Sequence, residues 1–212
     1  MSTRFLSIIT AGVIALGFSA SPVAAQPSAR VEPPARINVP DMPANLEVPE
    51  GNEVFVHGRA IGTQNYVCLS APTGYRWQFL GPQATLFVPF ANDLQQQIGT
   101  HFLSPNPVEN GLARATWMGS FDSSQVWARA IANSTDPSYV EPNSIPWLLL
   151  QTVGTGAGPT DGALLANTTY IQRLNTAGGI APSTGCSQPG EIGSLALVPY
   201  TTDYFFYRAS RR

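Results

Sequence analysis

Short runs of β-prone residues, separated by glycine, proline, asparagine and aspartate, make up the chain over residues 53–209. Val54 and Val56 alternate with Phe55 and His57, and this period of two places successive side chains on opposite faces of a strand. Hydrophobic repeats with a helical period are nearly absent. The pattern predicts an all-β fold, either a single-domain β-sandwich or a barrel-like structure with short strands.

The predicted strands lie between the turn-forming breaks: Glu53–Ala60, Asn65–Ser70, Arg76–Leu80, Ala84–Val88, Gly99–Leu103, Ala113–Gly119, Val126–Ala132, Trp147–Val153, Thr169–Leu174 and Tyr204–Ala209. Two further segments, Ala91–Ile98 and Thr160–Ala166, are predicted to form short helical turns, the second capped by Thr160 or Asp161. Neither segment is long enough to change the fold class.

Residues 1–25 have the features of a secretory signal peptide. Arg4 precedes an apolar run over residues 5–18, and small residues at Val23 and Ala25 fit cleavage before Gln26. The run is shorter than the roughly 18 to 20 apolar residues that a membrane span needs. An uncleaved anchor is the alternative. We therefore expect a secreted or periplasmic protein with no integral membrane segment after cleavage.

Residues 26–52 are rich in proline and poor in aromatic residues. This composition predicts an extended leader that lies on or beside the folded domain. Within the leader, Ile37–Pro40 could also dock as an edge strand. Residues 53–212 are then expected to form one β domain.

The chain has two cysteines, Cys68 and Cys186. In an oxidising compartment two thiols of one domain are more often paired than free, so we predict a disulfide between them. The bond would tie an early strand to a late loop and, in the chain-entropy model, would destabilise the unfolded state by about 4 to 5 kcal/mol. The alternative is a reactive thiol, although neither cysteine has a close sequence partner of the C-x-x-C type.

The charged residues exclude several classes of function. The chain contains no lysine, which excludes Schiff-base chemistry on a lysine and a P-loop lysine. Its formal net charge is −2, with 11 basic against 13 acidic residues. Because nucleic acid is bound through clustered basic side chains, we expect no nucleic-acid partner.

Several motifs follow one another along the chain: Gly62–Cys68 (GTQNYVC), Gly99–Phe102 (GTHF), Ile145–Leu148 (IPWL), Tyr170–Gly179 (YIQRLNTAGG) and Val198–Tyr207 (VPYTTDYFFY). In this order they resemble the family known as domain of unknown function 3455, over nearly the whole mature chain. The resemblance implies an exported protein of bacterial or fungal type and no established activity. Some fungal members are labelled malate dehydrogenase, and this sequence can be examined for the motif that such an activity needs.

A nicotinamide-dependent dehydrogenase would need a glycine-rich dinucleotide fingerprint. The segment Leu148–Pro159 ends in Gly154, Gly156 and Gly158, but Pro159 stands where a G-x-x-G motif needs its last glycine. The following residues are too few and too rich in threonine for a helix that binds a pyrophosphate. We therefore expect no nucleotide cofactor and interpret the glycines as a flexible loop.

His57 and His101 are the two histidines, and neither has a second histidine at a spacing that holds zinc. We therefore expect no metal and no other cofactor, and a structural, hydrogen-bonded setting for each histidine. The catalytic alternative is a secreted hydrolase that uses His101 as a base, or a pair of carboxylates. The candidate carboxylates are Asp122, Asp136, Glu141, Asp161 and Asp203.

Aromatic and polar residues of the family-like motifs predict a ligand site formed by Gln64, Tyr66, His101, Trp147, Tyr170, Arg173 and Asn175. Asn65, Gln172, Tyr200 and Tyr204 belong to the same set by composition. Flat rings flanked by amide and guanidinium donors suit sugars, so an extracellular glycan or an envelope component is the candidate partner. The competing interpretation is structural, with buried tyrosine and glutamine satisfying backbone groups and Asn175–Gly179 forming a turn with glycines at positive φ.

Taken together, these features favour a non-catalytic binding or structural module of the periplasm, envelope or extracellular space over an enzyme. One structural observation separates the two hypotheses. A closed, hydrogen-bonded setting for His101 favours the module, whereas a cleft that unites His101, Arg173 and a carboxylate favours the hydrolase.

Overall fold

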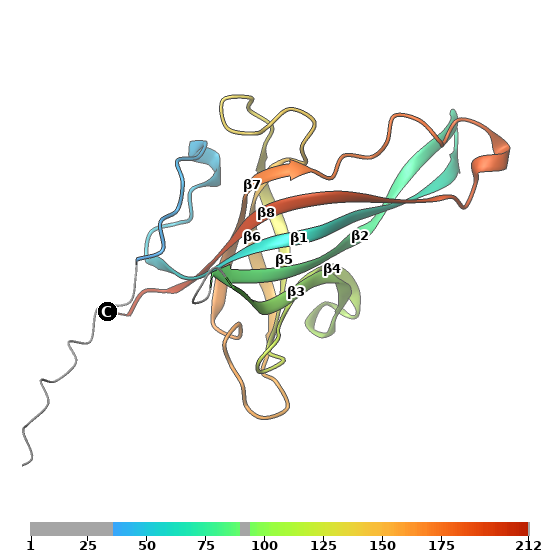
Figure 1. Ribbon diagram of the computed structural model, residues 1–212. Helices are drawn as coiled ribbons and strands as arrows, with labels where there is room; N and C mark the ends of the chain where they lie inside the picture. Colours follow the sequence, from blue (N-terminus) through green and yellow to red (C-terminus); the bar gives the residue numbers. More distant parts are fainter. Residues whose placement is uncertain (1–35, 90–93, 212) are drawn as a thin grey trace, which may run out of the picture. The chain divides into compact units, whose positions relative to one another are not determined.

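The computed structural model describes residues 36–89 and 94–211, which form a closed barrel of eight antiparallel strands (Figure 1). Each strand pairs with its neighbours in sequence, and β1 closes the barrel against β8. The strands are β1 (Asn52–Ala71), β2 (Gly74–Pro89), β3 (Gln95–Asn106), β4 (Leu112–Gly119), β5 (Gln125–Ser134), β6 (Trp147–Gly156), β7 (Thr168–Gly178) and β8 (Leu195–Ala209). The all-β prediction is confirmed, and the barrel is the form it takes. The predicted signal peptide and the start of the leader lie outside the described residues.

The helical segments that the structure describes are short 3-10 turns: η1 (Ala44–Leu46), η3 (Pro107–Glu109) and η4 (Pro189–Glu191). No helix in residues 36–89 or 94–211 is both long and apolar enough to cross a membrane. The predicted helical turn over Ala91–Ile98 is wrong for its described part, because Gln95, Gln96 and Gln97 pair with β2 as a strand. Residues 91–93 lie outside the described residues. The second predicted segment contains only hydrogen-bonded turns, such as Ala166 N to Ala163 O at 3.1 Å.

Two strands run through positions where the sequence predicts a break, because the glycines there bend the strand without ending it. At Gly62 a Cβ atom would lie 2.1 Å from Gln83 O, so this glycine permits a close approach of β1 to β2. Gly81 has φ +143° beside the bulge at which the β1–β2 register shifts, between Asn65 and Tyr66. The ten predicted runs therefore merge into eight longer, curved strands.

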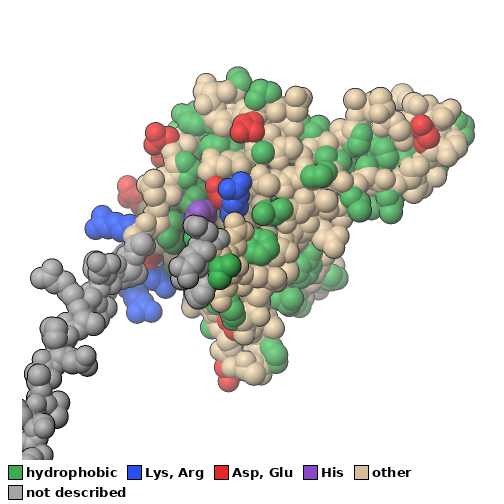
Figure 2. Space-filling model, viewed as in Figure 1, with side chains coloured by type: hydrophobic (Ala, Val, Ile, Leu, Met, Phe, Trp, Pro, Cys, Tyr) green, Lys and Arg blue, Asp and Glu red, His purple; other side chains and the backbone are tan. Residues whose placement is uncertain are grey.

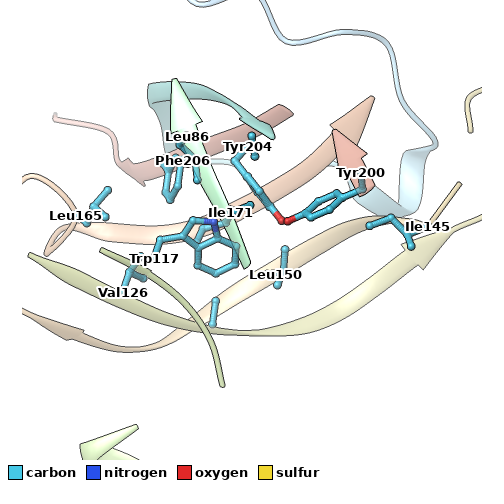
Figure 3. Packing of buried hydrophobic residues seen from close by; sticks show 13 residues of the cluster. Leu86, Trp117, Val126, Ile145, Leu150, Leu165, Ile171, Tyr200, Tyr204 and Phe206 are labelled. Carbon is cyan, nitrogen blue, oxygen red and sulfur yellow. The ribbon is translucent and has the colours of Figure 1, made fainter. Parts of the chain in front are cut away.

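The main hydrophobic core lies inside the barrel, and its members Leu86, Leu165 and Phe206 fill the end where β1 begins and β8 ends. Trp117 packs edge to face against Tyr204 and Phe206, with ring centroids 5.2 Å and 6.1 Å apart (Figure 3). The void that remains near Leu86, Leu165 and Phe206 is only about 10 Å³. This end of the barrel is therefore closed by close-packed side chains.

A second hydrophobic cluster, called the outer core below, lies outside the barrel, between the strands β6 to β8 and residues 37–48. Its buried members are Leu46, Val140, Trp147, Leu149, Leu174, Phe205 and Tyr207. Ile37, Val39, Met42 and Val48 of the proline-rich segment pack against them. From Arg36 onward this segment therefore covers the barrel wall. Apolar contacts hold it there, together with a hydrogen bond from the side-chain amide of Gln172 on β7.

The β1–β2 hairpin, the start of β8 and residues 180–194 extend from the barrel as an arm (Figure 1). A disulfide joins Cys68 of β1 to Cys186, with Cα atoms 5.4 Å apart, which confirms the predicted pairing. Gly193 N donates to Cys68 O at 2.9 Å, and Trp77 Nε1 donates to Thr184 O at 3.1 Å. The visible surface of the arm carries few charged side chains (Figure 2). The disulfide therefore fastens the long connection between β7 and β8 to the hairpin.

Candidate functional site

A cavity of about 500 Å³ lies inside the barrel, toward the end at which β1 turns into β2 and β3 turns into β4. Every strand contributes to its lining. Trp117 and Tyr204 are buried at its inner end, whereas Phe79 and Leu103 are exposed at its rim. The cavity has the size of small-molecule sites in proteins.

The cavity exists because four inward-facing positions of β4 and β5 carry alanine: Ala113, Ala115, Ala128 and Ala130. The interior of an eight-stranded barrel is just wide enough for large side chains to fill it, so alanine leaves room. The β4–β5 pairing also stops at the pair formed by Ala115 and Ala128. Toward the closed end, the same two strands place Trp117 and Val126 in the core.

A larger hollow of about 910 Å³ lies along the outer surface of β1, β2 and β3 and meets the cavity at Pro82, His101 and Leu103. The β2–β3 pairing stops there, at the pair formed by Ala84 and His101. This outer hollow is bounded by exposed aliphatic side chains and has none of the buried polar atoms described next. The barrel interior is therefore the better candidate site.

Four buried polar atoms of the barrel interior have no hydrogen-bond partner among the described residues: Gln64 Nε2, Trp117 Nε1, Tyr200 OH and Tyr204 OH. Gln64, Trp117 and Tyr204 line the cavity. The hydroxyls of Tyr200 and Tyr204 point toward one another (Figure 3), but no hydrogen bond of standard geometry joins them. Burial raises the pKa of both phenols, so they remain protonated donors. A cluster of buried polar groups without hydrogen-bond partners points to a ligand site, because each unpaired group costs about 1 to 3 kcal/mol.

Arg173 of β7 brings a positive charge to the same cavity. Its Nε and Nη2 atoms donate to Pro146 O, at 3.2 Å and 2.8 Å. Within the described residues, no carboxylate lies within 4.0 Å of its guanidinium. The charge opposes the ionisation of His101, adding to the effect of burial on the pKa of that ring. Arg173 is therefore a partly buried cation whose charge no acidic side chain balances at close range.

His101 is closed in and neutral. Its side chain stacks on Trp117, with ring centroids 4.1 Å apart, and the residue is 4% exposed. Burial lowers the pKa of His101 to about 3, aided by the charge of Arg173 and opposed by the hydrogen bond to Thr116. Nδ1 lies 2.9 Å from Thr116 O, so in the neutral ring Nδ1 carries the proton and Nε2 is the acceptor. This is the buried, hydrogen-bonded setting expected of a structural histidine.

The structure brings three of the seven residues of the predicted ligand site together at the cavity and separates the other four from it. Gln64, His101 and Arg173 line the cavity, whereas Tyr66 lies near its edge and donates from its hydroxyl to Gly179 O at 2.7 Å. Side chains alternate along β7, so Tyr170 faces the outer core while Arg173 faces inward.

The two remaining residues of the predicted site also lie outside the barrel. Trp147 is buried in the outer core. Asn175 is exposed, and its Nδ2 donates to Asp203 Oδ2 at 2.8 Å. The predicted turn over Asn175–Gly179 is instead a bulge in β7 and the residue that follows the strand, whereas the predicted positive φ of Gly178 and Gly179 is confirmed.

The predicted carboxylates do not converge on the cavity, and none of them lines it. Asp203 lies on the outer surface, where Oδ1 is 3.1 Å from His57 Nε2. Asp122 accepts hydrogen bonds from Ser124 N at 3.0 Å and from Leu164 N at 2.8 Å, which ties the β4–β5 turn to the loop before β7. Residues 36–89 and 94–211 contain no cluster of three potential metal ligands.

The interpretation of the glycines after Leu150 as a flexible loop is wrong for two of them. Gly154 and Gly156 lie within β6, and only Gly158 follows the strand. A Cβ at Gly154 would lie 2.7 Å from Asn106 Oδ1, so this glycine lets the end of β3 pack across β6. The antiparallel β7 follows, rather than a helix and a parallel strand.

Sequence reasoning did not identify Trp117, Leu148, Leu150 or the four alanines as lining residues. The available signal was the spacing Ala113-x-Ala115-x-Trp117 on one strand and Val126-x-Ala128-x-Ala130 on the next. Small residues at alternate positions of neighbouring strands indicate a barrel interior that large side chains do not fill.

Comparison with known proteins gives a family but no described activity. No curated protein and no solved structure matches the chain. The model of the family described as protein of unknown function (DUF3455) matches residues 49–208, which include β1 to β7, β8 up to Arg208 and every residue of the cavity. The chain therefore belongs to the DUF3455 family, and the motifs that suggested this resemblance are spread over its barrel.

Proposed function

We propose that the protein is an exported, non-catalytic binding protein that holds a small molecule inside its barrel. The observation that carries the proposal is the cluster of unpartnered donors at Gln64, Trp117, Tyr200 and Tyr204, within or beside a cavity of about 500 Å³. Export is supported by the signal-like residues 1–25 and by the disulfide, a bond that persists in oxidising compartments.

The setting of His101 argues against hydrolysis in this cavity. A general base works best with a pKa near the working pH, whereas the pKa of His101 is lowered to about 3. Its Nδ1 donates to the backbone oxygen of Thr116 rather than to a carboxylate that would stabilise a charged ring. The cavity lining also includes no serine, threonine or cysteine that could act as a nucleophile.

The structure favours an enclosed small molecule over a glycan held on the surface. The aromatic residues expected to form a sugar platform, Trp147 and Tyr170, pack in the outer core against or near residues 37–48. The cavity wall is mainly apolar, with Leu148, Leu150 and alanine side chains around a few polar groups. An apolar wall with a few polar groups is typical of small-molecule sites.

A thermal-shift screen of the purified protein against a small-molecule library tests the proposal. A ligand that binds the folded state raises the melting temperature. Ala128→Phe would place a ring in the cavity and abolish the shift, whereas the control Ile131→Phe, at an exposed position of the same strand, would retain it. Hits that shift Ala128→Phe as strongly as the parent would place binding elsewhere, and conversion of a hit to product would contradict the non-catalytic assignment.

A further inference from the structure

We infer that the ligand of this cavity is an organic anion with an apolar body, and that Arg173 binds its acidic group. The inference rests on the proposed function and names the class of molecule. It is carried by three properties of the lining: its charge, the kind of hydrogen-bonding group that it offers, and the separation of polar from apolar surface.

The charged side chains of the lining are all basic. Arg114, Arg129 and Arg173 line the cavity, and no aspartate or glutamate does. Arg114 is engaged by Glu109, with Nη2 to Oε1 at 2.6 Å, and Arg129 donates to the amide oxygen of Gln151 at 3.3 Å. Within the described residues, Arg173 has no carboxylate partner and donates to a backbone oxygen, so it is the cation best placed to bind an anion.

The unpartnered groups are all able to donate a hydrogen bond. Gln64 Nε2 and Trp117 Nε1 are N–H donors, and Tyr204 and Tyr200 carry hydroxyls whose ionisation burial suppresses. A carboxylate or sulfonate group accepts several hydrogen bonds and donates none. An anion therefore matches this set of donors, whereas an ammonium group would add donors and repel Arg173.

The rest of the lining favours an apolar body. Leu148 and Leu150 form one wall, and the alanines of β4 and β5 form another. At the inner end Trp117 stacks on His101, which remains uncharged because burial lowers its pKa to about 3. A bound molecule would thus place its acidic group toward Arg173 and its hydrocarbon part along the leucines and alanines.

Three probes with the same ring system and different charge test the inference: naphthoate, naphthamide and naphthylmethylamine, which is a cation at neutral pH. Their affinities for the protein are measured by calorimetry. We expect naphthoate to bind about 10- to 100-fold more tightly than naphthamide, the range that a charge-assisted hydrogen bond supplies, and naphthylmethylamine to bind most weakly. This ranking needs no variant, so it stands even if substitutions at Arg173 impair folding.

The variant Arg173→Met should lower the affinity for naphthoate to about that for naphthamide, while the affinity for naphthamide stays nearly unchanged. Arg59→Met is the matched control, because Arg59 of β1 is an exposed arginine that does not line the cavity. Equal affinity of the parent for naphthoate and naphthamide, or tightest binding of the amine, would overturn the inference while leaving a binding cavity in place. If no probe binds, the inference is wrong, and the library screen with Ala128→Phe decides separately whether the proposed function stands.

Discussion

Two buried glutamines show how the barrel interior differs from the outer core. Gln172 is 0% exposed, and its Nε2 donates to Leu46 O at 2.7 Å while its Oε1 accepts from Tyr207 OH at 2.6 Å. Gln64 is 3% exposed, and its Nε2 has no partner in the described part of the chain. The same side chain is thus bonded at both ends in one region and left with a free donor in the other.

The difference separates groups that hold the fold from groups that are free to bind a ligand. A buried polar group with its partners in place stabilises one arrangement of the chain, as Gln172 does by fastening Leu46 to the barrel wall. A buried donor without a partner costs stability and persists where it serves another role. Three other unpartnered buried atoms, Trp147 Nε1, Thr152 Oγ1 and Thr168 Oγ1, are spread along β6 and β7. Among the residues that the structure describes, only the barrel interior gathers such groups around a cavity.

The largest effect is expected in the outer core, at Trp147. The variant Trp147→Ala removes a ring that is 4% exposed and leaves a cavity, so it should destabilise the protein by about 3 to 5 kcal/mol. Urea unfolding measures the loss. Because Trp147 does not line the cavity, affinity for a cavity ligand should be retained at temperatures where the variant stays folded. Selective loss of affinity in a folded variant would remove the distinction between the two regions.

The next effect is expected at Gln172. Replacement by leucine keeps the volume but leaves Leu46 O and Tyr207 OH without their partner, at a cost of about 2 to 4 kcal/mol. Proteolysis near residue 46 should also become faster, because the covering segment loses its hydrogen bond to β7. A variant as stable as the parent would show that the apolar contacts alone hold the segment.

The lowered pKa of His101 predicts that the stability of the protein depends on pH. Its pKa is about 3 in the folded protein and 6.5 in the unfolded chain, so as the pH falls below 6.5 the unfolded state binds the proton first. Stability is therefore lost between pH 6.5 and about 3, with a contribution of about 2 to 3 kcal/mol by about pH 4.5. Urea unfolding at neutral and acidic pH should show a smaller loss for His101→Gln than for the parent. Equal losses would mean that the ring is protonated without cost in the folded barrel.

The smallest effect on stability is expected at Gln64. A variant at this position tests most directly whether the barrel interior differs from the outer core. Because Nε2 has no partner to lose, Gln64→Leu should change the free energy of unfolding by less than about 1 kcal/mol, or raise it slightly. The same variant should weaken the binding of naphthoate measured by calorimetry. A large loss of stability would instead assign Gln64 the structural role that Gln172 has.

The alternation of residues 53–57 and the pairing of Cys68 with Cys186 were readable from the sequence, because a period of two and an isolated pair of cysteines each have few structural solutions. The strand ends were less readable. Gly62 and Gly81 resemble turn residues, yet they lie within long strands where the wall curves or two backbones approach closely. Pro199 also lies inside β8, at a position beyond the last pair with β7, where its missing N–H is tolerated.

The site was only partly readable, because the motifs mix residues of both faces of the wall. Within the motif Tyr170–Gly179, Arg173 faces the cavity while Tyr170 and Gln172 face the outer core, and a bulge after Leu174 interrupts the alternation. Composition alone marks all of these residues as polar or aromatic. Only the register of the barrel tells which of them share a space.

The pairing of Asn52 with Ala209 has a practical consequence for handling the molecule. An even number of antiparallel strands returns the chain to the rim it left, so both ends of the barrel wall lie opposite the rim of the cavity. A protein immobilised on a sensor through its C-terminus would therefore present the cavity to the solution, and a C-terminal fusion would leave its entrance free. A circular permutant opened at Asn110 and Gly111, between β3 and β4, would instead have its termini at the entrance of the cavity. Its two charged chain ends would then lie beside the entrance.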